Sequence, residues 1–212
     1  MIDVLIPSRG HPELLVRSVD SLLSLAGSPE QVMIYVAADG DDPETIAVAS
    51  ELGTCQVFSD RPGYAGLHVY YQGLAELGTA DWLLVWNDDT TMLTAFWDTI
   101  LHEQSPSVLI ADLQSNHSPT MCCFPAVRRE AVEALGRFCS DNPHVDTFWQ
   151  DVGRATGTIA PVPVRVQHDQ VTTSEHFGNQ HDYYGRAHQA QLAACTETIR
   201  RYAEDAALEQ SH

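Results

Sequence analysis

Apolar and polar residues are arranged along the first part of the chain in blocks that predict strands and helices in turn. Short apolar runs of about four to eight residues are typical of buried strands, whereas apolar residues spaced about three or four apart are typical of a packed helix face. The runs predict strands at Ile2–Ile6, Val32–Ala38, Thr54–Phe58 and Trp82–Trp86. The spaced patterns predict a helix that opens at Pro12 and further helices at Pro43–Leu52 and Leu67–Leu77.

Strands that alternate with helices in this order predict an α/β fold, with a parallel sheet covered by helices on both faces. In such a sheet, ligands bind beyond the carboxyl ends of the strands. The residues at the predicted strand ends are polar: Ser8 and Arg9, Asp39, Arg61, and the run Asn87-Asp88-Asp89. We therefore expect a binding site along this edge of the sheet.

The second half of the chain is less regular, and its elements are predicted from shorter patterns. Strands are expected at Val108–Ala111, Met121–Phe124 and Val162–Val166, and helices at Arg128–Leu135 and Asp146–Ala155. Val162, Val164 and Val166 alternate like an edge strand, and Pro161 and Pro163 are expected only at a sheet edge or a bulge, because proline has no amide hydrogen to donate to a neighbour. A last helix carries Leu192, Cys195, Ile199, Tyr202 and Ala206 on one stripe.

A polar stretch, Gln167–Arg186, separates the last predicted strand from the last helix. It contains His176, His181, Tyr183 and Tyr184, and aromatic rings often stack on sugars. We expect a lid or an acceptor loop here, and an ordinary surface loop is the alternative. The sequence shows neither an internal repeat nor a low-complexity linker, so one domain is predicted.

The net charge of the chain limits the kinds of molecule that it is expected to bind. The chain has 29 acidic residues against 11 Lys and Arg, which gives a formal net charge of −18 at pH 7. This balance argues against a broad nucleic-acid-binding surface, which would need clustered Lys and Arg. An anionic ligand would need local help, either from Arg side chains or from a divalent cation.

The N-terminus and the cysteines bear on the compartment. No apolar run reaches the length of about 18 residues that a membrane span needs, and the start of the chain lacks the features of a signal peptide, so a cytoplasmic protein is expected. The cysteines are odd in number and lack metal-type spacing, which predicts reduced, mostly buried thiols. They are Cys55, Cys122, Cys123, Cys139 and Cys195.

The apolar run Trp82–Trp86 leads directly into Asn87-Asp88-Asp89. Buried carboxylates are unfavourable unless they are paired, protonated or bound to a metal. Mg²⁺ and Mn²⁺ prefer carboxylate and water oxygens and can bridge to phosphates, so this strand exit could hold a cation. The alternative is an acidic surface turn that caps a helix after Thr90 or Thr94. The role of Asp39 is undecided for the same reason: it could be a site residue, or it could belong to a simple turn before Pro43.

Five segments between residues 2 and 169, in the same order, resemble motifs of glycosyltransferase family 2, whose members have the GT-A fold. "VLIPSRGHPELLVRSVDSLL" resembles the opening "IPxYNRxxxLxxxLxSL", and "VAADGDDPET" resembles "VDDGSxDxT". "GLAELGTADWLLVWNDDTTM" resembles "GLxxAxGxYIxFLDDD", the segment with the DxD motif. "VDTFWQDVGRATG" has the shape of "EDxDLxxRxxxxG", and "VRVQHD" resembles the strand and His near the end of GT-A domains.

The resemblance implies a fold and a reaction. The fold is a single GT-A domain, residues 1–212, with a mostly parallel Rossmann-like sheet flanked by helices and a C-terminal helix. Residues 1–90 would form the nucleotide-binding half, 91–186 the acceptor-side half and 187–212 the C-terminal helix. The reaction is the transfer of a sugar from a nucleotide-sugar donor, with a UDP-sugar as the first choice, to an acceptor hydroxyl with the help of Mn²⁺ or Mg²⁺. The acceptor is left open.

The resemblance also assigns roles to residues. Asp146 would be the general base, and Asp89 and His168 would bind the metal. The residues assigned to the donor nucleotide are Pro7, Ser8, Arg9, Asp39, Asn87 and Asp88. Arg61, beside Pro62-Gly63, is placed to meet a phosphate or a base.

Each assignment has a plainer alternative. Asp146 could be the N-cap of its helix, since Asp is a favoured cap. His168 could be a surface His beside Asp169, and Arg61 could be solvated. The neighbouring Arg128 and Arg129 fit a polar helix face.

The sequence also departs from the family pattern at three places. Asn87 stands at the first DxD position, Tyr70-Tyr71 stands where the family often has Arg-Asn, and Val145 stands where it usually has Glu. These departures leave open the donor, the strength of metal binding and whether the reaction inverts or retains the anomeric configuration.

Two other functions compete. A nucleotidyltransferase would bind a nucleotide on a similar sheet, but the first strand–helix turn lacks a Gly-rich phosphate loop followed by Lys. A non-catalytic nucleotide-sugar-binding module is favoured by Asn87 and Val145.

Overall fold

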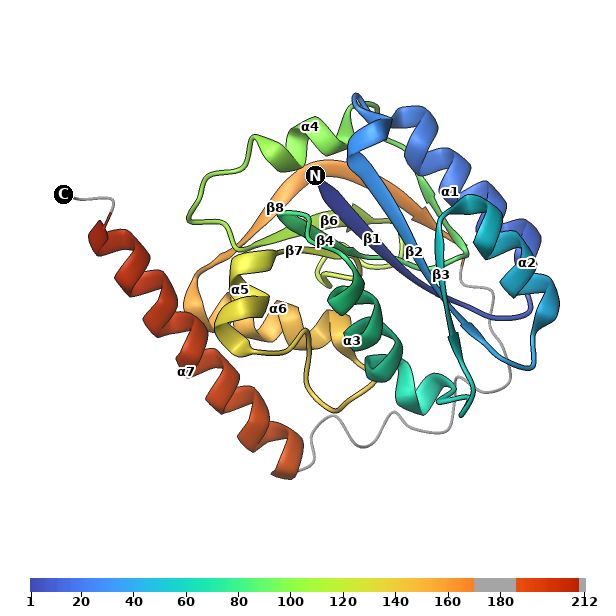
Figure 1. Ribbon diagram of the computed structural model, residues 1–212. Coiled ribbons are helices and arrows are strands. Elements are labelled where there is room, and N and C mark those ends of the chain that lie inside the picture. Colours follow the sequence, from blue (N-terminus) through green and yellow to red (C-terminus); the bar gives the residue numbers. More distant parts are fainter. Residues whose placement is uncertain (170–185, 210–212) are drawn as a thin grey trace.

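The computed structural model describes residues 1–169 and 186–209 (Figure 1). The strands are β1 (Ile2–Ser8), β2 (Val32–Asp39), β3 (Thr54–Phe58), β4 (Trp82–Val85), β5 (Thr90–Met92), β6 (Ile110–Ser115), β7 (Pro125–Arg128) and β8 (Ile159–His168). The helices are α1 (Pro12–Leu25), α2 (Pro43–Leu52), α3 (Leu67–Leu77), α4 (Trp97–His102), α5 (Arg129–Leu135), α6 (Val145–Thr156) and α7 (Arg186–Glu209).

All of these strands belong to one sheet, in the order β3-β2-β1-β4-β7-β6-β8-β5. The pairs among β1, β2, β3 and β4 are parallel, as is β6 with β8, whereas β7 runs antiparallel to β4 and β6, and β5 antiparallel to β8. Ile2 of β1 is in register with Val32 of β2 and with Trp82 of β4. The carboxyl ends of β1, β2 and β4 therefore meet at one edge of the sheet, as expected.

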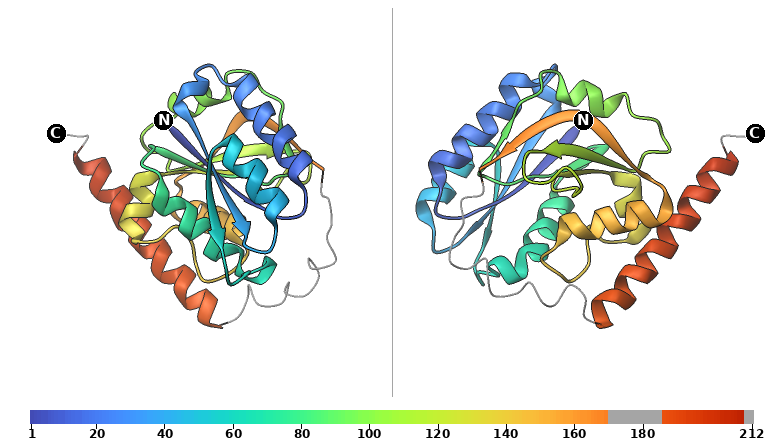
Figure 2. Two further views of the ribbon diagram at one scale, coloured as in Figure 1. Left: turned by 45° about the vertical axis from the view of Figure 1, so that its right-hand side comes forward. Right: turned by 180° about the vertical axis from the view of Figure 1, so that it is seen from behind.

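Helices cover both faces of the sheet, because the central strands are apolar on both sides. Val4 and Ile6 of β1 pack in one core cluster with side chains from α1, α2 and α4, while Leu5 packs in a second cluster with α3, α5, α6 and α7. The views of Figure 2 show these two layers on opposite sides of the sheet. The α/β fold predicted from the sequence is confirmed.

The C-terminal helix α7 lies across the outer side of α5 and α6 (Figure 1). Of its predicted stripe, Cys195 and Ile199 are buried, and Leu192 and Tyr202 are partly buried against the same cluster. The cysteines are free thiols, and all except the half-buried Cys55 are buried, as predicted.

The predicted strands of the second half are shifted along the chain. The strand expected at Val108–Ala111 extends from Ile110 to Ser115, and the one expected at Met121–Phe124 is instead Pro125–Arg128. The apolar signal misleads here because Phe124 is fully buried although it precedes the strand.

β8 is not an edge strand, which corrects that reading, but a register shift lies at Pro163, which agrees with the alternative of a bulge. It lies between β6 and β5, but β5 pairs only with Val166–His168. Pro161 and Pro163 therefore have no β5 residue beside them, and the pairing of β8 with β6 is interrupted by a register shift between Leu113 and Gln114. A proline is tolerated in such a place because no ladder hydrogen bond is lost.

Candidate functional site

The turn after β1 is fastened to two neighbouring strand ends. The Ser8 hydroxyl donates to Asp88 Oδ2 at 2.7 Å, and the Gly10 amide donates to Asp42 Oδ2 at 2.7 Å. The pKa of Asp88 is raised to about 6, chiefly by burial and also by the neighbouring charge of Asp89, while the Ser8 hydrogen bond opposes the rise. The structure thus brings Ser8 and Asp88 together, as predicted for the strand-end edge.

Asp39, at the end of β2, has both carboxylate oxygens engaged and a side chain that is 2% exposed. Oδ2 accepts a hydrogen bond from Arg9 Nη1 at 2.9 Å, and Oδ1 accepts one from the Tyr70 hydroxyl. Tyr70 in turn accepts from the Gly63 amide at 3.1 Å. The helix cap in this segment is Asp42, whose carboxylate accepts from Thr45, so Asp39 does not serve as the cap of α2.

The two neighbouring tyrosines, Tyr70 and Tyr71, both hydrogen-bond residues at the strand ends, which their position in the sequence did not predict. Tyr71 donates to the Trp86 carbonyl at 2.9 Å and lies 3.3 Å from Asn87 Oδ1. Two neutral hydroxyl donors from α3 thus hold Asp39 and the exit of β4.

The segment Asn87–Asp89 connects β4 to β5, and α4 begins only at Trp97 with Phe96 as its N-cap. The reading of this segment as a cap for a following helix is therefore wrong. Asp89 is 7% exposed, and its Oδ1 lies 3.1 Å from His168 Nε2. Because β5 pairs with β8, Thr90 is in register with His168, which brings the two distant motifs together.

His168 is held by its neighbours and is not a loose surface side chain. Its side chain is 18% exposed, and its ring packs edge-on against Phe124 with centroids 5.3 Å apart. Asn116 accepts from the His168 amide at 2.7 Å and donates to the His168 carbonyl at 3.3 Å. Asn116 had no sequence signal, because it lies in a polar segment far from His168 in the chain.

The chemistry of this donor set suits a divalent cation. The His168 ring nitrogen Nε2 faces both the Asp89 carboxylate and the Asn87 amide nitrogen, which is 3.4 Å away. Within the described residues no three His, Cys, Asp or Glu side chains gather into a metal cluster. Mg²⁺ and Mn²⁺ commonly take few protein ligands and complete their shells with water and substrate phosphates. Asp89 and His168 fit that pattern.

Asp146 lies in the first turn of α6 and is not its N-cap, because that position is taken by His144. The alternative of an N-cap is therefore wrong. Its Oδ1 accepts from the Thr147 amide at 2.7 Å, and burial raises its pKa above the usual value despite that hydrogen bond. The pKa of Tyr71 is raised by burial first and then by the charges of Asp146, Asp88 and Asp89, so Asp146 lies near the acidic strand exit.

Two further predicted residues have other partners. Pro7 is paired within the sheet opposite Ala37. Arg61 Nη1 lies 3.8 Å from Asp41 Oδ2, with a side chain that is 44% exposed. The segment with His176, His181, Tyr183 and Tyr184 lies outside the described residues.

Arg128 and Arg129 are structural, which corrects their reading as a polar helix face. Arg128 bonds the Val108 carbonyl at 2.9 Å and stacks 4.4 Å above the Trp82 ring. Arg129 pairs with the buried Asp3 at 3.0 Å.

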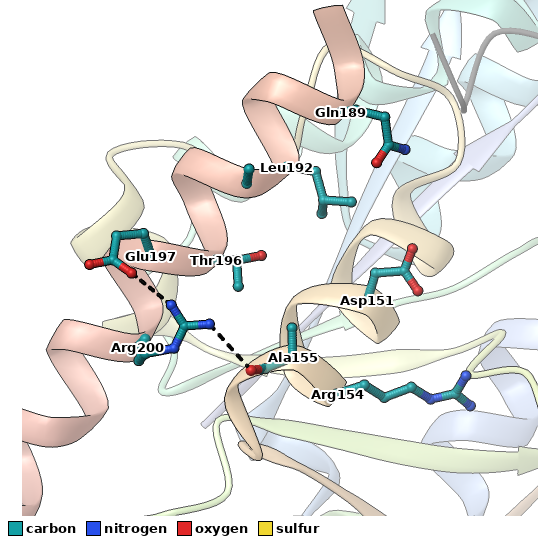
Figure 3. A pocket seen from close by; sticks show the side chains of 9 residues that line it. Asp151, Arg154, Ala155, Gln189, Leu192, Thr196, Glu197 and Arg200 are labelled. Atoms are coloured by element: carbon teal, nitrogen blue, oxygen red, sulfur yellow. Dashed lines mark hydrogen bonds and ion pairs between the residues drawn. The ribbon is translucent and has the colours of Figure 1, made fainter. Parts of the chain in front are cut away.

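A cavity of about 690 Å³ lies between α6 and α7 (Figure 3). Its walls include Asp151, Arg154 and Arg200, and Arg200 is bound to Glu197 and to the Ala155 carbonyl. None of its lining residues belongs to the strand-end edge, so the acidic centre described above is a separate place.

Comparisons with known proteins identify the fold. The chain is similar to the mannosyltransferase PcManGT from Pyrobaculum calidifontis, solved in complex with GDP-Man and Mn²⁺, with a TM-score of 0.57 and 16% identity; the match covers 82% of this chain and 58% of that one. It is similar to S. aureus TarS 1-349 in complex with UDP, with a TM-score of 0.56 and 8% identity, covering 78% and 57%. The chain has a GT-A-like fold.

The fold implied by the sequence motifs is thus confirmed. The chain spans less than two thirds of these solved chains, and 35% of a longer TarS structure. No family model and no curated protein matches the sequence. None of the helices in the described parts of the chain has both the length and the apolar character that crossing a membrane requires.

Proposed function

We propose that this chain transfers a sugar from a nucleotide-sugar donor to an acceptor hydroxyl, with a divalent cation at the donor diphosphate. The observation that carries the proposal is that Asp39, Asp89 and His168 lie at one end of a GT-A-like sheet. Burial raises the pKa of Tyr71, and the charge of Asp146 is near enough to Tyr71 to raise it further, together with the charges of Asp88 and Asp89. Ligands bind at this end in sheets of the same kind. That PcManGT was solved with GDP-Man and Mn²⁺, and TarS with UDP, supports a nucleotide donor.

The donor nucleotide would lie along the ends of β1 and β2. Ser8, Arg9 and Asp39 form the floor of this region, with Pro7 behind them in the sheet, and Arg61 stands at its rim. A UDP-sugar is the first donor to test, and a GDP-sugar is the second because of the mannosyltransferase likeness. Asn87 and Asp88 would face the ribose and the diphosphate.

Asp89 and His168 would hold Mn²⁺ or Mg²⁺. When bound, such an ion supplies Lewis-acid stabilisation of the negative charge on a departing nucleoside diphosphate. Asn116 holds the main chain of His168, and Phe124 packs against its ring, whose Nε2 faces Asp89. The ligand groups are therefore arranged before the donor arrives, which avoids a cost of ordering them on binding.

Asp146 would take the proton of the acceptor hydroxyl. A base works best when its pKa lies closer to the working pH, and burial shifts the pKa of Asp146 upward in that direction. The Thr147 amide and hydroxyl both donate to Oδ1, at 2.7 and 3.3 Å, so Oδ1 is fixed. Those contacts orient the carboxylate at the helix start.

The test separates donor binding from turnover. Asp146→Asn should lower turnover by about 10²- to 10⁴-fold, because a positioned base is removed, while nucleotide affinity stays near the wild-type value. The acidic limb of the pH–rate profile, with a midpoint above the usual Asp value, should disappear with it. Asp151→Asn, on the same helix but at the α6–α7 cavity, is the matched control and should keep wild-type turnover.

Asp89→Ala should remove the part of nucleotide binding that depends on Mn²⁺. Wild-type activity in that variant would contradict the metal assignment. A non-catalytic nucleotide-sugar-binding module is the second candidate, because Asn87 replaces an acid and the buried Val145 leaves no second carboxylate beside Asp146. Incubation with donor, metal and acceptor decides between the two, since only a transferase releases free nucleoside diphosphate.

A further inference from the structure

The guanidinium of Arg9 is shared between two carboxylates that differ sharply in exposure. Nη1 donates to Asp39 Oδ2 at 2.9 Å and also to Asp41 Oδ1, while Nη2 donates to Asp41 Oδ2 at 3.0 Å. The Asp39 side chain is 2% exposed and the Asp41 side chain is 55% exposed. Arg9 therefore has one buried partner and one partner at the surface.

Asp41 also draws the second arginine of this edge toward itself. Arg61 Nη1 lies 3.8 Å from the same Asp41 Oδ2 that accepts from Arg9 Nη2. The pKa of Asp41 is lowered, mainly by its hydrogen bonds from Arg9 and also by the charge of Arg61. This carboxylate is therefore ionised at neutral pH. A single surface anion thus lies between two arginines at the rim where the donor would bind.

The main chain around Arg9 is fixed independently of this ion pair. Ser8 donates to Asp88 through its hydroxyl, the Arg9 amide hydrogen-bonds Asp88, and the Gly10 amide donates to Asp42. The guanidinium can therefore change its outer partner while the turn and the bond to Asp39 remain in place.

We propose that Asp41 is an internal counter-anion, which occupies the outer face of Arg9 until the diphosphate of the donor replaces it. This inference rests on the proposed function. A phosphate matches the two-pronged geometry of a guanidinium as well as a carboxylate does. Exchange is easy because exposed ion pairs are weak in water. Asp41 therefore lowers donor affinity and keeps Arg9 oriented in the absence of donor.

The experiment compares nucleotide affinities by titration calorimetry in the presence of Mn²⁺. The probes are UDP and GDP, and uridine and guanosine serve as uncharged counterparts. Asp41→Asn should bind the nucleoside diphosphate about two- to fivefold more tightly than the wild type, the range expected for release of an exposed ion pair. It should bind the uncharged nucleoside with unchanged affinity.

Asp60→Asn is the matched control, because it removes one negative charge from an exposed residue beside Arg61. It should keep the wild-type affinity. In an Arg9→Ala background, Asp41→Asn should give no gain, because the arginine that it releases is missing.

Three results would overturn the inference while leaving the proposed function intact: equal affinities of Asp41→Asn and wild type, an equal gain for the nucleoside, or an equal gain in Asp60→Asn. Failure of the wild type to bind any nucleoside diphosphate would overturn both. Thermal melting of each variant shows that the fold is retained, which is expected because the Asp41 side chain is largely exposed.

Discussion

Removing Arg129 should destabilise the fold far more than its place near the surface suggests. Its Nη2 lies 3.0 Å from Asp3 Oδ2, its Nε donates to the Ala80 carbonyl at 2.7 Å, and its Nη1 donates to the Ala75 carbonyl at 3.3 Å. Asp3 lies in β1 and is 1% exposed. Arg129→Met leaves that carboxylate with the Ala80 amide, at 2.9 Å, as its remaining hydrogen-bond donor among the described residues.

The size of the loss of stability follows from the Asp3 carboxylate, which stays buried without its cationic partner. Breaking a buried ion pair by removing one partner costs about 3–5 kcal/mol, which corresponds to a fall in Tm of about 10 °C in a domain of this size. Burial already raises the pKa of Asp3, and the Arg129 charge opposes that rise. Without Arg129 the folded-state pKa rises further, so the variant loses stability as the pH rises through it. The loss should therefore be larger at about pH 8 than at about pH 5.

Urea denaturation at the two pH values measures this loss. Asp3→Asn combined with Arg129→Met should recover much of it, because no charge is then buried alone. Arg128→Met is the control: Arg128 bonds carbonyls and stacks on Trp82 but pairs with no acid among the described residues, so its loss should not vary with pH. A loss below about 1 kcal/mol, the range of an exposed ion pair, or one that is equal at both pH values, would refute this reasoning.

Two further predictions concern the site. Asn116→Ala should weaken the Mn²⁺-dependent part of nucleotide binding, by up to about tenfold, because Asn116 holds the main chain of His168 and so positions its ring; calorimetry with and without Mn²⁺ checks this, and equal weakening in both would place its effect elsewhere than on His168. Tyr70→Phe should destabilise the fold by about 1–3 kcal/mol in urea, because the buried Asp39 loses one of its partners; unchanged stability would mean that Arg9 alone satisfies that carboxylate.

The helices and strands of the first half could be predicted from the sequence because their buried residues fall within regular helices and strands. The parallel strands β1 and β2, buried along nearly their whole length, give continuous apolar runs. The edge strand Thr54–Phe58 and the helix Leu67–Leu77 also match their predicted bounds. In the second half, apolar burial and regular structure no longer coincide. Phe124 is buried in an irregular segment, and β8 carries prolines although it is an inner strand, because β5 is too short to pair with them and the pairing with β6 shifts register at Pro163.

For the site, the sequence could indicate which residues lie close together but not which hydrogen-bond partners hold each of them. Strand ends identify Asp39, Asp88 and Asp89, because parallel strands bring their carboxyl ends together. The groups that hold these residues come from elements that no strand-end argument selects: Tyr70 of α3 donates to Asp39, and Asn116, in the segment after β6, bonds the main chain of His168. Only the packing of helices and strands reveals such partners.

The charge balance at the strand-end edge gives an independent reason to expect a cation there. Arg9 and Arg61, the arginines beside the ends of β1 and β2, both already face Asp41, and Arg17 is paired with Asp169. The carboxylates of the edge outnumber them: Asp39, Asp41, Asp88, Asp89 and Asp146. A donor diphosphate would add further negative charge to a region where burial already raises the pKa of two of these acids. A divalent ion held by Asp89 and His168, as proposed, would offset that repulsion, so donor affinity should depend steeply on the metal.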